Sequence, residues 1–298
     1  MKRKFYATSA VIALAMSVLA TGCSSSKQRV ATEEATDSAS MAADTLTVDS
    51  IGRSHVAEDS LVQSSVMVQF PQGSDSLAIA VRGYINNQLA DFYMPYCNGE
   101  LSQRKRTVYT GDLADGQAMV DFYEKGNYKY VYDEWKSLNE ISHEEGIGTA
   151  SDVKIKKTAE NDKYLTYTAT QYCYLGGAHG SWTAFTTNIA KKTHKVLTAT
   201  VDAKRLADLQ PLLRKGVVEY LKECGVEDVN TDNVLKFLQL EGNTIPMPAE
   251  TPYLATDGVH FCYQQYEIAD YATGMVGFVV SYDDIKPYLT EEAKQLVE

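Results

Sequence analysis

The sequence predicts an α+β fold in which antiparallel sheets pack against helices in two adjoining subdomains. Several stretches alternate β-branched and aromatic residues with polar ones, and short turn sequences separate them, as is typical of antiparallel strands. Other stretches place apolar residues at helical spacing, but they do not alternate regularly with the strands, which argues against a parallel α/β sheet. The chain contains no internal repeat.

The chain begins with the features of a secretory leader. Lys2, Arg3 and Lys4 form a positive segment, and an apolar run over about residues 10–20 follows. This run is shorter than the roughly 20 apolar residues that a membrane-spanning helix needs, and no comparable run occurs later. We therefore expect residues 1–22 to be a signal peptide.

The residues before Cys23 resemble the lipobox of lipoproteins. The segment Leu19-Ala20-Thr21-Gly22-Cys23 places small residues before a cysteine that is acylated and becomes the new N-terminus. It departs from the usual pattern because Ala20 occupies the usual leucine position. The alternative is cleavage by ordinary signal peptidase. We expect Cys23 to be lipidated, which would anchor the protein firmly because each buried methylene contributes roughly 0.8 kcal/mol.

The exported chain would be strongly acidic. The full chain has 28 Lys+Arg against 39 Asp+Glu, and removal of the leader leaves 25 Lys+Arg and a net charge of about −14. Such a surface repels nucleic-acid phosphates and attracts cationic partners. We expect no nucleic-acid role.

A polar segment follows the proposed anchor. From Ser24 to about Val62 the sequence is rich in Ser, Thr, Ala, Asp and Glu, and it contains no aromatic residue. Such a composition cannot bury enough apolar surface to fold alone. We expect residues 23–62 to be a flexible tether.

The first half of the folded part predicts one strand and two helices. Ser65–Phe70 alternates like a strand, and Leu77–Tyr93 has apolar residues at helical spacing. A second helix is predicted over about Gly116–Lys125. The aromatic-rich stretch Tyr128–Tyr132 is ambiguous between strand and helix.

Two pairs of strands are predicted next. Strands near Val153–Ile155 and Tyr164–Tyr172 form a hairpin around the Asn161-Asp162 turn, and Ala184–Ala190 pairs with Lys195–Thr200. Short hairpin connections favour antiparallel pairing. An antiparallel sheet is therefore expected here.

The last part predicts a long helix, two strands and a short helix. Leu206–Cys224 is amphipathic, and Gly225 is placed to cap it. Val259–Tyr263 and Met275–Ser281 supply partner strands, and Asp283–Leu289 is expected to be a short helix.

Four cysteines follow Cys23, namely Cys97, Cys173, Cys224 and Cys262. An even number in an oxidising compartment permits disulfides in three pairings. Buried free thiols are the alternative, because the folded part is large enough to form a core without cross-links. No CxxC spacing occurs, so neither a thioredoxin-like site nor a zinc knuckle is expected. We expect no metal and no cofactor.

Two motifs in the C-terminal half, Tyr172–Gly180 (YCYLGGAHG) and Tyr263–Gly274 (YQQYEIADYATG), carry a family resemblance. Together they resemble the RsiV-like domain family, DUF3298, over about Tyr164–Leu289. Residues 63 to about 160 are similar in size and pattern to the DUF4163 or PdaC-type domain that commonly precedes it. Together with the leader and the tether, the resemblance gives four expected parts: signal peptide 1–22, lipidated tether 23–62, DUF4163-like α+β domain 63–163 and RsiV-like α+β domain 164–298.

The resemblance implies a role in protein recognition. In the anti-sigma factor that gives the family its name, this domain binds lysozyme and is thereby exposed to signalling proteolysis. The present sequence lacks a transmembrane helix and a cytoplasmic sigma-binding segment, so control of a sigma factor does not carry over. In another relative the domain accompanies a separate polysaccharide deacetylase, whose metal motif is absent here.

The two motifs also supply the candidate binding residues, which are Tyr174, Gly176, Gly177, His179, Tyr263, Tyr266 and Tyr271. Glycine allows positive φ and close backbone approach to a ligand, although the glycines can equally form a crossing between two strands. The histidine could bind a metal or act as a base, but no HxH, HxxxH or HExxH pattern accompanies it, and a structural histidine is the alternative. Tyrosine serves recognition surfaces and also sheet packing.

Catalytic alternatives have weaker support. Ser181 does not lie in a GxSxG sequence, so a serine hydrolase is not indicated. Glu267 and Asp270 lie near other acidic residues and could form a glycosidase-type carboxylate pair, but acidic loop residues are common in so negative a chain.

We therefore expect a membrane-anchored extracytoplasmic binding lipoprotein that recognises a lysozyme-type muramidase or another cationic envelope protein. The alternatives are binding of cell-wall glycan such as peptidoglycan, and a role as accessory to an envelope-glycan hydrolase or deacetylase. The sequence favours the outer membrane facing the periplasm, because Ser24–Ser26 lacks the acidic cluster often seen in surface-exported lipoproteins. Exposure at the cell surface is the other possibility.

Overall fold

The computed structural model describes residues 45–97, 105–142 and 146–298, which belong to one compact unit, Ala43–Glu298. The predicted signal peptide, Cys23 and the first part of the predicted tether lie outside these residues. Within the described part, five α-helices and two sheets that are mainly antiparallel confirm the α+β class. No helix in the described ranges is long and apolar enough to cross a membrane.

Strand β1 shows that the fold begins earlier than the sequence indicated. β1 (Val48–Ala57) pairs antiparallel with β2 (Val62–Pro71) along its whole length. The expected tether over residues 23–62 is therefore wrong from Val48 onward. The low apolar content of this segment prevents it from folding alone. An edge strand, however, forms its backbone hydrogen bonds with a sheet whose core other residues supply.

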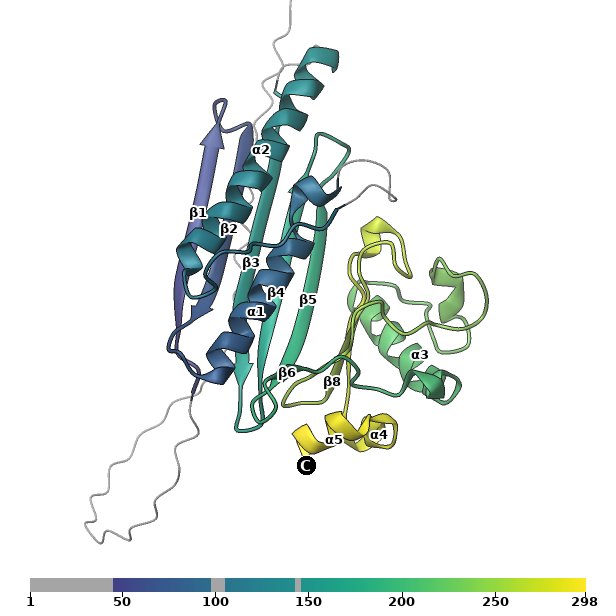
Figure 1. Cartoon of the computed structure of the whole chain (residues 1–298). Helices are drawn as coiled ribbons and strands as arrows, with labels where there is room; N and C mark the ends of the chain where they lie inside the picture. Colours follow the sequence, from purple (N-terminus) through teal and green to yellow (C-terminus); the bar gives the residue numbers. More distant parts are fainter. Residues whose placement is uncertain (1–44, 98–104, 143–145) are drawn as a thin grey trace, which may run out of the picture. The chain divides into compact units, whose positions relative to one another are not determined.

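Helices α1 (Ser76–Asp91) and α2 (Gly116–Ser142) cover one face of the large sheet (Figure 1). Asp75 caps α1 by accepting hydrogen bonds from two backbone N–H groups of its first turn. The ambiguous aromatic stretch that begins at Tyr128 is helical and belongs to α2. The helix predicted from Leu77 is confirmed.

The large sheet has the strand order β1-β2-β3-β4-β5-β6. The predicted hairpins are confirmed, and every neighbouring pair in this sheet is antiparallel except β2 and β3. These two strands run parallel because the long connection through α1 and α2 returns the chain to the same end of the sheet. The remaining strands are β3 (Thr149–Glu160), β4 (Tyr164–Tyr174), β5 (Ser181–Ala190) and β6 (Lys195–Val196).

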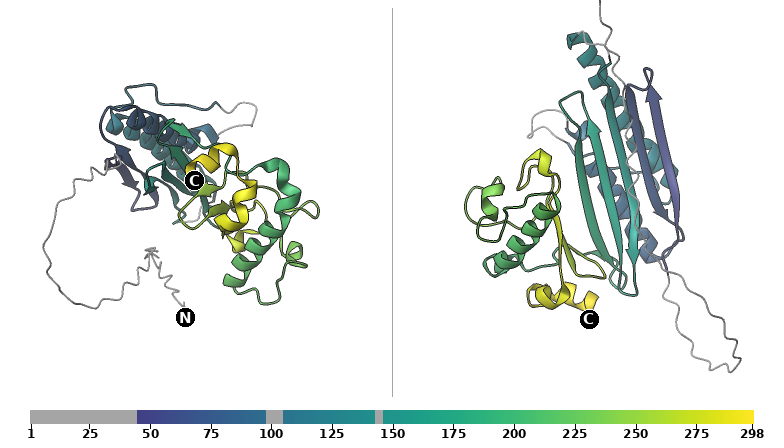
Figure 2. Two further views of the ribbon diagram at one scale, coloured as in Figure 1. Left: turned by 90° about the horizontal axis from the view of Figure 1, so that it is seen from below. Right: turned by 180° about the vertical axis from the view of Figure 1, so that it is seen from behind.

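Alternation along the strands gives the sheet two different faces. On β4, the side chains of Leu165, Tyr167 and Ala169 are buried in the core formed with α1 and α2. The alternate residues Thr168 and Thr170 point to the opposite face of the sheet. No helix covers this face in the rear view of Figure 2. The strands therefore combine one apolar and one largely polar face.

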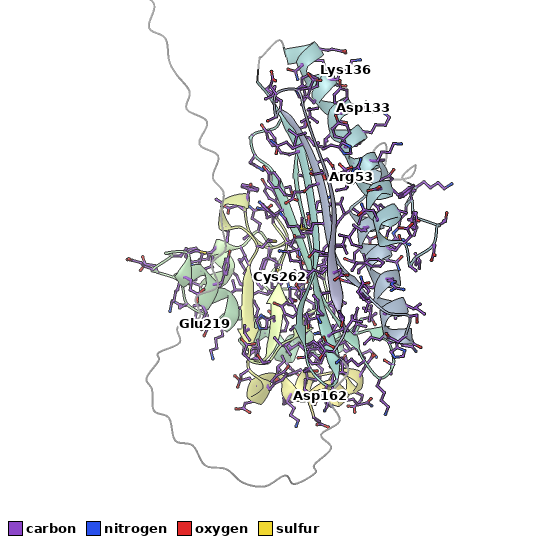
Figure 3. All side chains as sticks on the ribbon, turned by 90° about the vertical axis from the view of Figure 1, so that its left-hand side faces the viewer. Arg53, Asp133, Lys136, Asp162, Glu219 and Cys262 are labelled. Atoms are coloured by element: carbon purple, nitrogen blue, oxygen red, sulfur yellow. The ribbon has the colours of Figure 1, made fainter. Side chains whose placement is uncertain are left out.

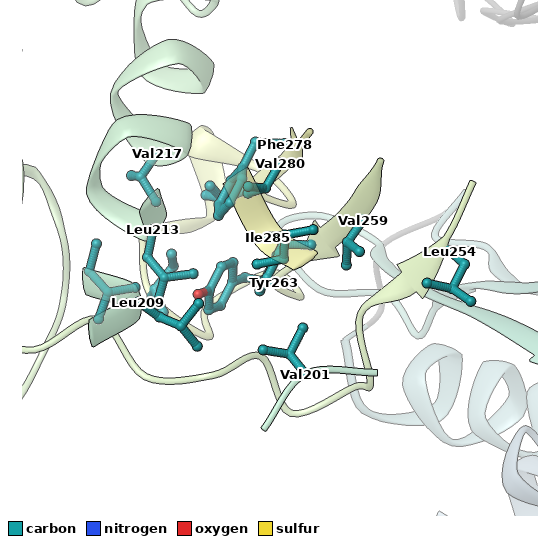
Figure 4. Close-up of a cluster of buried hydrophobic side chains, with 14 of the residues drawn as sticks. Val201, Leu209, Leu213, Val217, Leu254, Val259, Tyr263, Phe278, Val280 and Ile285 are labelled. Carbon is teal, nitrogen blue, oxygen red and sulfur yellow. The ribbon is translucent and has the colours of Figure 1, made fainter. Parts of the chain in front are cut away.

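The C-terminal half builds a second core around helix α3 (Leu206–Glu223), part of which is drawn in Figure 4. Gly225 at φ +89° ends this helix, as predicted. Gly216 leaves room for the ring of Phe278, since a Cβ there would lie 2.1 Å from that ring. The other elements are β7 (Tyr253–Leu254), β8 (Val259–Cys262), β9 (Gly277–Val280), α4 (Tyr282–Ile285), α5 (Glu291–Val297) and the 3₁₀ turns Met94–Cys97, Ala203–Arg205, Val234–Phe237, Tyr271–Thr273 and Lys286–Tyr288.

The two cores meet at strands β4 and β5. The expected boundary at residues 163/164 falls in the β3–β4 hairpin, so one sheet continues across it. Leu165 and Ile189 belong to the first core, whereas their neighbours Tyr164 and Ala190 belong to the second. The two subdomains therefore share strands and do not separate at that position.

A carboxylate–imidazole pair holds β1 against α2. The Glu124 side chain on α2 is fully buried, and its two oxygens lie 2.8 and 2.7 Å from Nδ1 of His55. The His55 ring also stacks on Tyr128. Arg53, labelled in Figure 3, adds a longer ion pair to Asp121 at 3.9 Å. β1 is therefore attached through side chains as well as through its backbone.

His55→Ala is expected to lower the free energy of unfolding by about 2 kcal/mol, because Glu124 would stay buried without its partner. Urea unfolding of the variant measures this loss. Ser54→Ala, which changes an exposed neighbour on the same strand, is the control and should unfold like the original chain. Equal midpoints for both variants would show that β1 does not depend on this pair.

Buried tyrosines make the fold sensitive to alkaline pH. The Tyr123 hydroxyl donates to Oδ1 of Asn86 at 2.6 Å and accepts from the backbone N–H of Tyr109 at 2.8 Å. Burial raises the pKa of Tyr123 to about 12, and burial likewise raises the pKa of Tyr84 to about 12. Both groups therefore prefer to stay protonated in the folded chain.

Stability is expected to be constant with respect to these groups below pH 10, their ordinary pKa, and to fall as pH rises toward 12. The loss should be about 2 kcal/mol for each tyrosine, since the unfolded chain releases the proton first. Urea unfolding at several pH values, with tyrosinate absorbance, measures it. Tyr123→Phe should show a smaller alkaline loss; an equal loss would contradict the assignment.

Candidate functional site

The two sequence motifs lie against each other in the structure. Gln264 in the second motif pairs with the backbone of Ala184 on β5, accepting from its N–H at 3.0 Å and donating to its carbonyl at 2.8 Å. The Gln265 side chain accepts from the N–H of Trp182 at 2.9 Å. The Tyr271 hydroxyl donates to the carbonyl of Gly180 at 2.8 Å. Side chains of the second motif therefore satisfy backbone groups along the edge of β5, the strand that follows the first motif.

The glycines of the first motif form the connection between β4 and β5. Gly176 has φ +78°, and a Cβ there would lie 2.4 Å from Cδ1 of Leu138. A Cβ at Gly180 would lie 2.3 Å from the ring of Tyr172. Gly177 has open space around it, and its carbonyl accepts from the Tyr174 hydroxyl at 3.1 Å. This geometry is that of a tight hairpin loop between two antiparallel strands, in which the Tyr174 hydroxyl stabilises the turn.

His179 lies at the surface among aromatic rings. Its ring stacks on Tyr271 with centroids 3.5 Å apart, and its Nε2 lies 3.3 Å from the hydroxyl of Tyr266. Nδ1 lies 3.1 Å from the carbonyl of Gly180, so the tautomer with a proton on Nδ1 donates to Gly180 and accepts from Tyr266. Among the described residues no carboxylate hydrogen-bonds to His179. His179 therefore forms no acid–base pair with a carboxylate in the described part of the chain.

Tyr266 is held outward by an unusual backbone conformation. Its φ is +65°, a region that non-glycine residues seldom occupy, and 58% of the residue is exposed. Glu267 stabilises the surrounding turn, because its carboxylate accepts from the N–H of Gln264 at 2.7 Å and from that of Ala249 at 2.6 Å. Such strain persists only where neighbouring contacts fix it, and it is commonly found at functional sites.

Two further aromatic residues extend this surface, and the sequence reasoning missed both. Tyr172 and Trp182 are directly opposite each other on β4 and β5, and their rings lie 4.9 Å apart. Trp182 is 44% exposed. The hairpin register contained the signal, since a connection over residues 174–180 pairs residue 173 with residue 181 and so places residue 182 opposite residue 172. We call the five residues Tyr172, His179, Trp182, Tyr266 and Tyr271 the aromatic patch.

Tyr263, which the sequence suggested as a surface residue, belongs to the core. It is fully buried and its hydroxyl donates to the carbonyl of Pro246 at 2.8 Å (Figure 4). Burial raises its pKa. The reason is the alternation of β8, in which Val259 and Phe261 are buried and which continues to Tyr263 directly after the strand. The binding role expected for Tyr263 is therefore wrong.

The acidic residues considered for glycosidase chemistry have separate structural roles. Asp270 caps the 3₁₀ turn at Tyr271 by accepting from the N–H and the hydroxyl of Thr273, and these bonds lower its pKa. Asp257 pairs with His260 at 2.7 Å, which lowers the pKa of Asp257. In the described part of the chain, no group of three or more His, Cys, Asp or Glu could hold a metal ion.

The two cysteines of the C-terminal half, Cys224 and Cys262, form no disulfide in the described part of the chain. Cys224 and Cys262 carry free thiols, and burial raises the pKa of Cys262, labelled in Figure 3. A raised pKa keeps this thiol protonated and unreactive at neutral pH. The side chain of Cys97 lies outside the described residues.

The fold is that of an α+β protein in which helices cover one face of a sheet and a C-terminal half packs along strand β5 of that sheet. Comparison with solved structures gives the fold a name. A DUF3298 family member from Bacteroides fragilis NCTC 9343 matches with a TM-score of 0.59 and 18% identity, covering 84% of this chain and 95% of that one. A DUF3298 family protein from Pseudomonas aeruginosa PAO1 matches with a TM-score of 0.54 and 14% identity, covering 84% and 97%.

This chain therefore has the fold of DUF3298 family proteins, and the coverage extends beyond the C-terminal half to most of the described residues. No protein-family model matches the sequence, and no curated protein matches it.

Proposed function

We propose that this protein is a lipid-anchored lipoprotein of the cell envelope that binds a cationic envelope protein through the aromatic patch. A lysozyme-type muramidase is the proposed partner. In this proposal Cys23 carries the lipid, the chain faces the periplasm from the outer membrane, and the helix-covered subdomain, which has no boundary at residue 163, is DUF4163-like. The single observation that carries the proposal is the patch itself, built where the two motifs meet.

The patch suits protein recognition because its rings are exposed and already fixed in position. Trp182 and Tyr266 offer large apolar surfaces with a polar edge, and these residue types dominate binding energy at protein interfaces. Hydrogen bonds and stacking among His179, Tyr266 and Tyr271 reduce the conformational freedom that binding would otherwise remove. A partner could therefore bind here without much reordering of side chains.

Charge supports a basic partner. The full chain has a net charge of −11, and Asp270 provides an ionised carboxylate beside the patch because hydrogen bonds from Thr273 lower its pKa. Negative charge around an aromatic centre accelerates association with a cationic protein, and salt weakens the effect.

Glycan recognition is the second candidate, and one observation favours it. The patch presents flat aromatic faces beside hydroxyl and imidazole groups. Sugar rings stack on such faces and hydrogen-bond to such groups. In this case peptidoglycan would be the ligand. The protein would either bind the glycan as its sole function or bind it as an accessory to a partner hydrolase or deacetylase.

The test is direct binding of the chain lacking residues 1–22, with Cys23→Ser, to c-type, g-type and i-type lysozymes and to peptidoglycan fragments. The proposal expects saturable binding to at least one lysozyme that weakens as salt rises from low to physiological levels. Binding to glycan alone would favour the second candidate. Absence of binding to all three lysozymes would overturn the proposed partner.

A further inference from the structure

A pocket of about 580 Å³ lies between α1, the outer edge of β5 and residues 250–253. Its volume is within the range typical of small-molecule sites. Tyr84 and Gln88 line it from α1, Thr187 from β5, and Glu250 and Tyr253 from the C-terminal half. α1 covers one face of β5, whereas Trp182 of the aromatic patch points to the other. The pocket is therefore separate from the aromatic patch.

Glu250 is an unpaired carboxylate in the wall of this pocket. It is half-buried, and no described residue forms an ion pair or hydrogen bond with it. Burial raises its pKa, and the carboxylates of Glu267 and Asp91 raise it further. Half-buried carboxylates normally have a partner, because removing a charge from water without one is costly.

Three charged groups near the pocket already have partners. Asp91 pairs with Arg106 at 2.6 Å, and Glu267 accepts two backbone hydrogen bonds. His194, on the turn between β5 and β6, is the remaining titratable group apart from the two tyrosines. Arg106 is engaged with Asp91 and the Asn87 carbonyl at 2.8 Å. Apart from His194, no basic side chain is among the described residues that line the pocket.

Two polar atoms in the wall also lack partners. The Tyr84 hydroxyl and Oε1 of Gln88 are buried without any hydrogen bond. Thr187 is near enough to the Tyr84 hydroxyl to lower its pKa slightly, but the two are not in hydrogen-bonding geometry. Tyr84 is 7% exposed, and buried polar groups are satisfied in the great majority of cases. Both residues line the pocket.

We propose that this pocket binds a small organic cation, in which a primary ammonium group faces Glu250 and hydroxyl or amide groups meet Tyr84 and Gln88. Ammonium and carboxylate form a charge-assisted hydrogen bond, which is stronger than a neutral one. The walls have the hydroxyl and amide groups that suit a polar, hydrogen-bonding body. An amino sugar and the end of a lysine side chain share this chemistry.

Calorimetric titration of the full chain with glucosamine, glucose and N-acetylglucosamine tests the charge requirement, because the three sugars differ mainly at the amino group. Glucosamine is expected to bind at least about tenfold more tightly than the two neutral sugars. Nα-acetyl-lysinamide, titrated in parallel, presents the same ammonium on a protein-like chain. Whichever amine binds more tightly identifies the source of the cation. Absence of binding by both amines would overturn the proposal.

Variants locate the effect. Glu250→Gln keeps the size of the side chain and should remove the preference for the charged ligands, whereas Glu241→Gln, an exposed control, should not. Tyr84→Phe should weaken amine binding about threefold to tenfold by removing one hydroxyl. Thermal unfolding of each variant confirms that it is folded. An unchanged preference in Glu250→Gln would place the binding elsewhere. Neither result depends on binding to lysozyme.

Discussion

Replacing Asn188 by leucine is expected to lower the free energy of unfolding by about 3 kcal/mol. The Asn188 side chain is buried on β5 and pairs with the backbone of Leu254 on β7: it accepts from the Leu254 N–H at 2.6 Å and donates to the Leu254 carbonyl at 3.0 Å. It also donates to the Thr166 hydroxyl at 3.0 Å. Leucine has a similar volume but would leave these buried groups without partners.

This substitution tests how the C-terminal half is attached to β5. The Asn188 side chain pairs with the backbone of the C-terminal half, and the Gln264 side chain makes the same kind of pairing with the backbone of β5 further along the strand. Urea unfolding measures the loss. The control is Thr170→Leu. Thr170 is a half-buried polar residue on the neighbouring strand β4, on the same face of the sheet as Asn188, and its replacement should change stability by less than about 0.5 kcal/mol. Equal stability of the two variants would mean that the amide is not needed to hold the C-terminal half.

Trp182→Ala is expected to weaken binding of a lysozyme-type partner at least about thirtyfold, the effect of losing a large aromatic anchor at the centre of an interface. The substitution should leave stability nearly unchanged, because 44% of Trp182 is exposed and its backbone N–H still bonds to Gln265. Calorimetry or biolayer interferometry of the variant measures the affinity.

Phe237→Ala supplies the matched control, because Phe237 is an aromatic residue of comparable exposure, 39%, that lies outside the patch. Its affinity should equal that of the original chain. Tyr266→Ala should resemble Trp182→Ala. If the control weakened binding as much as the patch variants did, general surface hydrophobicity and not the patch would be responsible.

Most elements were predictable because their periodicity reflects which face of the sheet or helix is buried. The helix at Leu206 and the hairpin around Asn161 are examples, and both are confirmed. Strand β1 was not predictable from composition, because it contributes backbone pairing and a polar contact through His55 to a sheet formed elsewhere. The parallel pairing of β2 and β3 depends on the route of the chain, which periodicity does not show.

The candidate site was only partly predictable. The motifs pointed to His179, Tyr266 and Tyr271, which the structure brings together. Trp182 was missed because its role arises from the register between two strands. Tyr263 was misplaced although its alternation with Phe261 marked it as a core residue. The pocket at Glu250 joins segments far apart in the sequence, so no local pattern could indicate it.

Hydroxyl-radical footprinting of the complex with a bound lysozyme shows where the partner binds, because tryptophan and tyrosine side chains are oxidised where solvent reaches them. Oxidation of Trp182 and Tyr266, which are exposed in the free chain, is expected to fall several-fold at saturation while oxidation of Phe237 stays unchanged. Unchanged oxidation of both patch residues in a saturated complex would show that the partner binds elsewhere and would contradict the role assigned to the aromatic patch.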